Sequence, residues 1–377
     1  MLFCIKKTVA QTPDSALINQ LIKEIAAMQY TKEGRYVFHT GMFYSYKKWA
    51  GNPQRITPDN NIFFTGIIAF ALKSMLPYLS NENRKLGEKI IANAAAAYPY
   101  YQNKQKKPTY FFWQGGKPIM PNTLLAQHLS NILATSEDID DSIMLLMAMD
   151  APDSSSRKLK LIMDSVANGK RRKIRNTFKK YRDLPAHTTY LGMKMRVDYD
   201  FAVHCNTLYF LLQNKVPFNQ HDSATVTLLQ QMIQNREYIK HPHFIAPYYI
   251  KPPVILYHLA RLMGKFTIPA LELYKQQIID DINIQLQKTG NILDDVILRT
   301  SLLRLGVQTH PLSINSMKEF SSSNQEQFVF YQARAASQSG LLLKKIFINC
   351  SIFNYHFFCG AFNKILLLEY LVERNKR

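Results

Sequence analysis

The chain has 377 residues, of which 47% are hydrophobic and 20% charged, a balance that excludes an intrinsically disordered protein and supplies material for a large core. Its 47 Lys and Arg residues against 27 Asp and Glu residues give a formal net charge of +20. This excess predicts attraction to polyanions, among them nucleic acid, an anionic membrane surface and phosphate-bearing substrates.

Two kinds of helix alternate along the chain. Period-3.6 patterns recur from end to end, and strand-like alternation is confined to stretches such as 35–46, which predicts an all-α protein. Helices with a polar face are expected on the outside, at 14–29, 81–97, 156–170, 224–240 and 270–287. Helices that are apolar nearly all round are expected inside, at 61–76, 140–149, 200–212, 252–263, 293–306 and 355–371.

This alternation predicts one domain over residues 1–377, a single (α/α)6-like toroid in which outer helices wrap a ring of inner helices around a cavity. Most inner helices open with polar groups, which we expect to gather at one mouth of the cavity: Asn60, Asn61, Thr65, Asp138, Asp140, Asp141, Asp200, His204, Asp294, Asp295, Asn354, Tyr355 and His356. A basic loop at 168–192 is expected to be an insertion in this pattern.

The sequence DIDDS at 138–142 has two interpretations. Asp138 is a good helix N-cap, and Asp141 three residues later mimics a capping box, so the acids need do no more than start a helix. The alternative makes Asp140 a general acid, because repulsion from Asp138 and Asp141 and burial in an apolar cavity would both raise its pKa. Both interpretations stay open on the residues alone.

The same motif resembles the DxDD motif of class II terpenoid cyclases, the group that includes the squalene-hopene cyclases. Segments at 109–122, 197–211, 248–262 and 353–371 are similar to small bacterial toroid proteins related to the terpenoid cyclase and protein prenyltransferase superfamily. The resemblance implies that Asp140 protonates a double bond or an epoxide of a linear isoprenoid, supported by Asp138 and Asp141. The chain departs from that family in having two Trp residues and no QxxxGxW repeats.

Further candidate residues lie on the inner helices. Asp200 and His204 are one helical turn apart, so His204 is a candidate partner of the acid, although such a histidine also occurs as an ordinary core residue. The remaining candidates are assigned to substrate binding with Asp200: Asn206, Tyr257, Asp294, Asp295 and Tyr355. No metal site is expected, and no cofactor other than Mg²⁺ if the substrate is a diphosphate.

The positive charge is densest at Lys170, Arg171, Arg172, Lys173 and Arg175, for which an anionic membrane surface is the partner we expect. No RNA-binding signature is present, so nucleic acid is not expected. The four cysteines lack CxxC spacing, and no stretch reaches about 18 uninterrupted apolar residues, which predicts a cytoplasmic protein with peripheral membrane contact as an option. Two other functions remain open: a non-catalytic toroid that binds a lipid or protein, and a carbohydrate-active toroid using Asp140 and Asp294.

Overall fold

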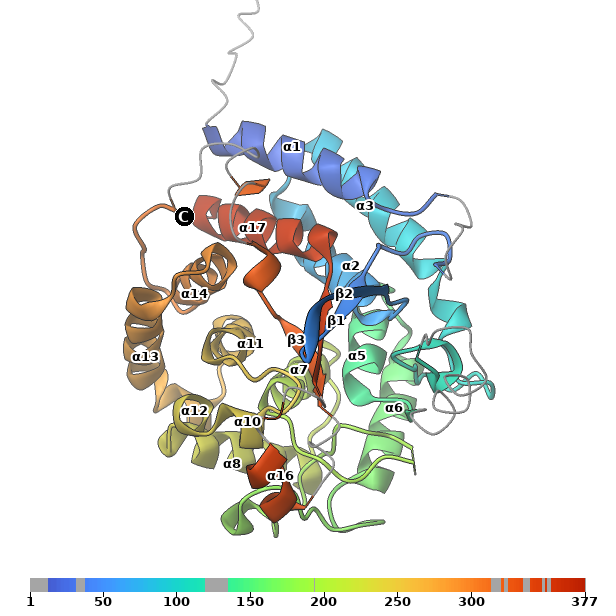
Figure 1. The fold of residues 1–377 in the computed structure, drawn as a ribbon, viewed down its shortest axis with the longest axis vertical. Helices are drawn as coiled ribbons and strands as arrows, with labels where there is room; N and C mark the ends of the chain where they lie inside the picture. Colours follow the sequence, from blue (N-terminus) through green and yellow to red (C-terminus); the bar gives the residue numbers. More distant parts are fainter. Residues whose placement is uncertain are drawn as a thin grey trace, which may run out of the picture.

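A computed structural model describes residues 13–31, 38–118, 135–192, 194–312, 320–321, 325–334, 340–347, 350 and 354–376. The protein is mostly helical, at 58%, with 15 α-helices and a four-stranded antiparallel sheet among these residues (Figure 1). The predicted dominance of helix is confirmed. The prediction of an all-α protein misses the sheet.

The apolar segments form the helices α2 (Phe63–Met75), α5 (Ile139–Ala148), α7 (Phe201–Gln213), α11 (Pro252–Lys265), α14 (Ile292–Arg304) and α17 (Gly360–Asn375). The amphipathic segments form α1 (Pro13–Ala27), α3 (Asn81–Ala95), α6 (Asp153–Val166), α8 (Gln220–Gln234) and α13 (Lys275–Lys288). Four shorter helices are α9 (Glu237–Lys240), α10 (Pro242–Ile245), α12 (Pro269–Glu272) and α16 (Leu341–Phe347).

The division into two kinds of helix appears in the packing. The apolar helices contact one another in a closed series, in which α2 packs on α5, α5 on α7, α7 on α11, α11 on α14, α14 on α17 and α17 on α2 (Figure 1). Every residue of α5 is buried, whereas α3 buries only the stripe Asn83, Gly87, Ile90 and Ala94. Because a helix without a polar face must be covered on most sides, the core lies among the first group.

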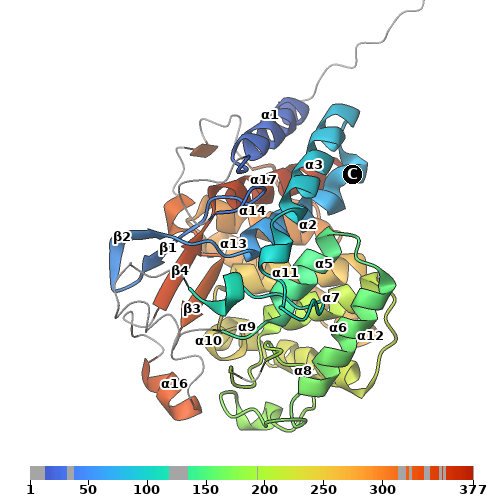
Figure 2. The same ribbon diagram turned by 90° about the vertical axis from the view of Figure 1, so that its right-hand side faces the viewer.

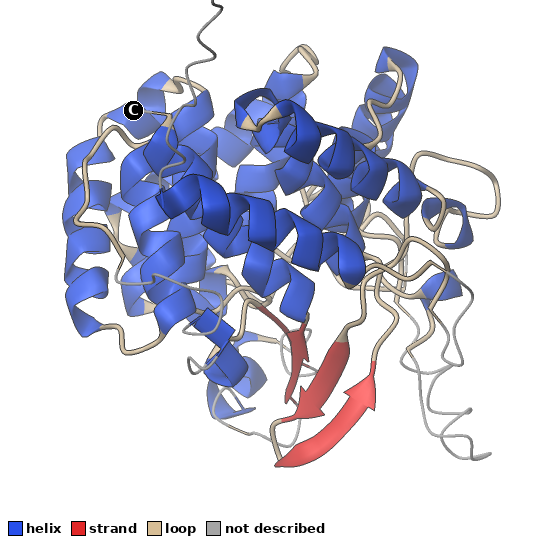
Figure 3. Cartoon of the chain, turned by 90° about the horizontal axis from the view of Figure 1, so that it is seen from above, coloured by secondary structure: helices blue, strands red, loops and turns tan. Residues whose placement is uncertain are grey.

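The sheet joins segments from both ends of the chain. Its strands lie in the order β2 (Asn52–Pro58), β1 (Tyr46–Trp49), β4 (Asn354–Phe358) and β3 (Tyr331–Arg334), and all neighbours are antiparallel. Figure 3 shows the sheet projecting from one side of the helices. The prediction that 355–371 is one helix is therefore wrong at its start, because residues 354–358 pair with strands on both sides and α17 begins at Gly360.

Asp59 fastens this sheet to the start of α2. Its carboxylate oxygen Oδ2 lies 2.9 Å from Nζ of Lys47 on β1, and both side chains are buried. Trp113 Nε1 donates a hydrogen bond to Asp59 Oδ1 at 3.0 Å, and Asn61 Nδ2 donates to the same atom at 2.9 Å. A buried charge is tolerable when it is paired and hydrogen-bonded in this way.

The expected basic loop contains only one short 3₁₀ helix, Lys179–Tyr181. Asn168 at its start donates from its side chain to the carbonyl oxygens of Arg182 and Leu184, further along the same loop, at 2.8 Å each. None of the described helices combines the length and apolar composition that a bilayer crossing requires. Cys4 and the rest of 1–12 lie outside the described residues, as do 35–37 of the strand-like stretch; its described part contains no strand before Tyr46.

Candidate acid site

Asp138 starts helix α5. Its backbone is extended, at φ −121° and ψ 162°, and its carboxylate accepts a hydrogen bond from the backbone N–H of Asp141 at 2.8 Å. Ser142 Oγ donates to the Asp138 carbonyl oxygen at 2.6 Å, which completes the first turn. The N-cap predicted for Asp138 is confirmed.

Asp140 is held by side chains from two other segments. Asn206 on α7 donates from Nδ2 to Asp140 Oδ1 at 2.6 Å, and the Tyr249 hydroxyl donates to Oδ2. Arg261 on α11 donates in turn to Asn206 Oδ1 at 2.5 Å. Because Arg has donors only, it fixes the amide oxygen of Asn206 toward itself and the amide nitrogen toward Asp140.

Asp141 has a different environment. Its side chain is buried, and neither carboxyl oxygen accepts a hydrogen bond from an N–H or hydroxyl group of the described residues; the side-chain group with which it interacts is the Asp138 carboxyl. An ionised carboxylate in such a place would lose its hydration without compensation, so the neutral, protonated form is strongly favoured.

All three carboxyl groups have raised pKa values. Burial raises the pKa of Asp138 to about 7. Burial also raises the pKa of Asp140, against the opposing hydrogen bonds of Tyr249 and Asn206. The pKa of Asp141 lies well above its usual range, first through burial and then through the neighbouring Asp138 charge. Charge repulsion raises the pKa of Asp141, from Asp138 and Asp140, and that of Asp138, from Asp140. For Asp140 burial is the cause that raises the pKa, and the predicted repulsion from Asp138 and Asp141 is not among its causes.

The three carboxyls border a small cavity with aromatic walls. About 10 Å³ is accessible to the centre of a water molecule, close to the least that holds one water. The other lining residues come from the starts of α2 and α7, the segment before α11, strand β3 and two loops: Phe63, Phe112, Thr189, Tyr190, Val203, Tyr248, Tyr249 and Tyr331. Residues at or near the starts of α2, α5, α7 and α11 thus meet at one place. Of the polar helix-start residues predicted to gather, only Asp138, Asp140 and Asp141 line this cavity.

Asp200 caps α7 beside this cavity. Its Oδ1 accepts from the Ala202 N–H at 2.9 Å, and its Oδ2 accepts from the Tyr248 N–H at 3.0 Å. Burial, with a smaller effect of the Asp140 charge, raises the pKa of Asp200 to about 8. Its carboxylate oxygens are occupied by backbone donors, so its role is to hold the segment before α11 against α7.

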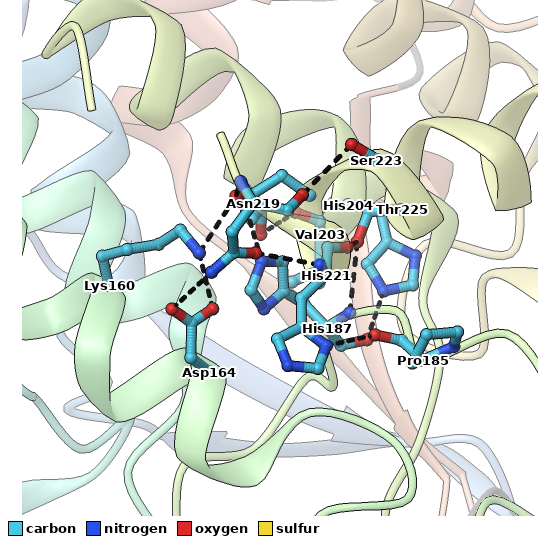
Figure 4. A network of polar contacts seen from close by, with 12 residues as sticks. Lys160, Asp164, Pro185, His187, Val203, His204, Asn219, His221, Ser223 and Thr225 are labelled. Atoms are coloured by element: carbon cyan, nitrogen blue, oxygen red, sulfur yellow. Dashed lines mark hydrogen bonds and ion pairs between the residues drawn. The ribbon is translucent and has the colours of Figure 1, made fainter. Parts of the chain in front are cut away.

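His204 does not contact the acid. Its Nε2 lies 2.9 Å from the His187 carbonyl oxygen, within the network drawn in Figure 4. In that network His187 Nε2 lies 2.7 Å from Asp222 Oδ1, and Lys160 Nζ lies 3.0 Å from Asp222 Oδ2. Burial lowers the pKa of His204 to about 4, so the ring is neutral at physiological pH. This geometry matches the core-residue interpretation and gives no contact for a catalytic role.

Four predicted substrate-binding residues lie away from the acids. The Tyr257 hydroxyl bonds to Glu369 on α17, and Asp294 pairs with Lys251. Asp295 pairs with Arg299 at 2.7 Å, and Tyr355 on β4 is 39% exposed. None of the four borders the cavity described above. Several helix starts meet at the cavity, but the side chains of these four residues do not point into it.

Several residues of the site were not singled out from the sequence, among them Tyr249, Arg261, His258 and Tyr331. His258 Nδ1 lies 3.0 Å from Asn206 Oδ1, and burial with the nearby Arg261 charge holds the pKa of His258 well below its usual range. His258 and Arg261 could have been identified from the sequence, because a His and an Arg at positions i and i+3 of an apolar helix require buried polar partners. No comparable signal marks Tyr331.

Among the described residues, no cluster of three or more His, Cys, Asp or Glu side chains is arranged to hold a metal ion. Comparison with known proteins finds no matching family model, no similar curated protein and no similar solved structure.

Proposed function

We propose that this protein is a class II, protonation-initiated cyclase of a linear isoprenoid, with Asp140 as the proton donor. The observation that carries the proposal is the burial of Asp138, Asp140 and Asp141 together at an aromatic cavity, where the pKa of each is raised. A carboxylic acid that protonates carbon must hold its proton near neutral pH, and desolvation is the means by which proteins arrange this.

The surroundings of the three carboxyls favour Asp140 as the donor. When an acid gives up its proton, groups that stabilise the new carboxylate lower the energy of the transition state. Asp140 has two such donors, Asn206 at 2.6 Å and the Tyr249 hydroxyl, with Arg261 behind Asn206. Asp141 has no N–H or hydroxyl donor among the described residues, and its neighbour Asp138 disfavours a second negative charge, so ionised Asp141 would be a poorly compensated buried charge.

The walls suit a cationic intermediate. Aromatic rings attract cations through their negative faces, and rings of Phe63, Phe112, Tyr190, Tyr248 and Tyr331 border the cavity. We also propose that the closed series of apolar helices, with the amphipathic helices outside it, is an α/α toroid of the kind that the terpenoid cyclase resemblance implies. The contacts of α17 with α2 support this, because they close the series.

One observation favours a second candidate, a non-catalytic protein that binds a lipid or a protein partner. The cavity in this conformation has room for about one water, whereas ligand pockets usually measure about 300–1,000 Å³. An isoprenoid must therefore displace covering side chains, and Tyr331 on the small sheet is one of the wall residues that lie outside the helices. The carbohydrate-active alternative gains no such observation, because Asp294 pairs with Lys251 and does not border the cavity.

The test is a product assay with matched variants. Wild type, Asp140→Asn and Asp141→Asn are incubated with linear prenyl diphosphates and with squalene, with and without Mg²⁺, and the extracts are searched for cyclic products. We expect turnover by wild type, a loss of roughly 100-fold or more in Asp140→Asn, and retained turnover in Asp141→Asn.

Thermal unfolding of each variant serves as the control, since asparagine preserves the shape of aspartate. Folded wild type that is inert toward every substrate would contradict the cyclase proposal and favour the non-catalytic candidate. An Asp140→Asn variant as active as wild type would leave a cyclase but remove Asp140 as its acid.

A further inference from the structure

Helix α16 faces the solvent with its apolar side chains. Leu342 is 73% exposed, Leu343 50% and Ile346 62%. The one buried residue of the helix is Lys344, whose Nζ lies 3.4 Å from the Asn176 carbonyl oxygen. This arrangement inverts that of an ordinary surface helix, and a contiguous exposed apolar surface usually marks a site of contact with a partner or a membrane. Figure 2 shows α16 at the edge of the molecule, beyond β3.

A basic groove begins where α16 begins. It has about 390 Å³ accessible to the centre of a water molecule, and Gly340, the residue before α16, lies in its wall with Arg172, Lys173, Arg175 and Arg196. Lys173 pairs with Asp183 at 2.5 Å.

The guanidinium groups of Arg172 and Arg175 are exposed and have no ion pair with the residues that the structure describes. Arginine matches phosphate oxygens with two parallel donors, so this groove fits anionic phosphate groups.

We infer that α16 and this basic groove form one membrane-docking surface for anionic phospholipid. Leu342, Leu343 and Ile346 enter the boundary between headgroups and acyl chains, while Arg172 and Arg175 contact lipid phosphates. The lipid surface is the occupant that fits, because it alone presents an apolar layer directly beside a plane of phosphates. A protein or RNA partner would have to supply both chemistries at the same spacing.

The groove also leads toward the acids. Arg172 and Arg196 border a second, smaller hollow together with Tyr190, and Tyr190 forms part of the wall of the acidic cavity. Docking would therefore bring the bilayer to the outer side of Tyr190, which separates the two spaces. The link between the groove and the acids matters only if the proposed isoprenoid function is correct. Membrane docking does not depend on that function.

The experiment measures co-sedimentation of the full chain with vesicles of phosphatidylserine and phosphatidylcholine, and with vesicles of phosphatidylcholine alone. Wild type is expected to bind the anionic vesicles and to be released by salt. The double variants Leu342→Ser/Ile346→Ser and Arg172→Ser/Arg175→Ser are each expected to weaken binding at least ten-fold. The control is Leu273→Ser, which removes a side chain that is 77% exposed but lies in the turn between α12 and α13.

A second readout follows insertion directly. In Leu342→Trp, the emission of the new tryptophan should shift to shorter wavelength when anionic vesicles are added, and in Leu273→Trp it should not.

The inference would be overturned by no binding of wild type to anionic vesicles, by unchanged binding of either double variant, or by tighter binding to RNA than to vesicles. A dimer in solution that the α16 double variant abolishes would assign α16 to a second copy of the chain instead. Because the substrate assay is not used here, failure of docking and failure of the cyclase proposal are separate outcomes.

Discussion

Replacing Asp138 by asparagine should change how the stability of the protein depends on pH. Asparagine caps a helix about as well as aspartate, so α5 should keep its start. In the folded protein the pKa of Asp138 is raised to about 7, while in an unfolded chain an aspartate titrates near about 3.9. Between these values the folded protein holds a proton that the unfolded chain has lost. The free energy of unfolding of wild type therefore falls as the pH rises through this window.

The size of the effect follows from the same values. Each pH unit within the window costs about 1.4 kcal/mol, which amounts to about 2 kcal/mol between pH 5 and pH 7 as the folded-state pKa is approached. Asp138→Asn lacks this titration. Its free energy of unfolding relative to wild type should therefore rise by about 2 kcal/mol between pH 5 and pH 7. Buried histidines with lowered pKa, such as His204, change stability in the opposite sense in both proteins and cancel in the difference.

The assay is urea unfolding of both proteins at pH 5, 6 and 7, followed by the fluorescence of Trp49 and Trp113. Asp153→Asn, at an exposed first-turn position of α6, is the control for loss of an ordinary aspartate. Parallel pH profiles for wild type and Asp138→Asn would refute the argument, because they would mean that Asp138 is ionised in the folded protein as it is in the unfolded chain.

Three further substitutions test other parts of the structure. Lys47→Met leaves the buried Asp59 carboxylate without its cation and should lower the free energy of unfolding by about 3–5 kcal/mol in a denaturant titration, whereas a change below about 1 kcal/mol would show that the pair is not buried. Glu369→Gln should lower the free energy of unfolding by less, because buried Arg304 keeps Glu373 at 3.8 Å as a second carboxylate partner, and an unchanged midpoint would contradict the pairing with Glu369. Tyr331→Ala should lower the free energy of unfolding by about 3 kcal/mol and increase the binding of an apolar fluorescent dye, and unaltered dye binding would mean that this ring does not cover the cavity.

The helices were predictable because each buries a face or its whole surface, and that requirement leaves a period of 3.6 in the sequence. Asp138 as an N-cap was predictable for a similar reason, since capping depends on residues within one turn. The sheet was not, because its strands are short and β1 pairs with β4 from the far end of the chain. Local alternation over four or five residues carries too little information to specify such a partner.

The site shows the same division. The presence of three acids at one helix start was visible in the sequence, but their different environments depend on Asn206, Tyr249 and Arg261, which come from other segments. His204 and Asn206 are two residues apart on α7 and have different partners. His204 contacts the His187 carbonyl, and Asn206 contacts Asp140. Spacing places both on an inner helix without saying which of them faces the acid.

The claim on which the account depends is that the buried acid cluster holds protons at neutral pH. Infrared spectroscopy of protein containing isotope-labelled aspartate measures this directly, through the carbonyl stretch of protonated carboxyl groups. We predict that the band of protonated aspartate persists at pH 7 and weakens in Asp140→Asn and again in Asp141→Asn, in agreement with the raised pKa of both groups. A spectrum at pH 7 with only ionised aspartate would contradict the account and leave the three carboxyls as the start of a helix.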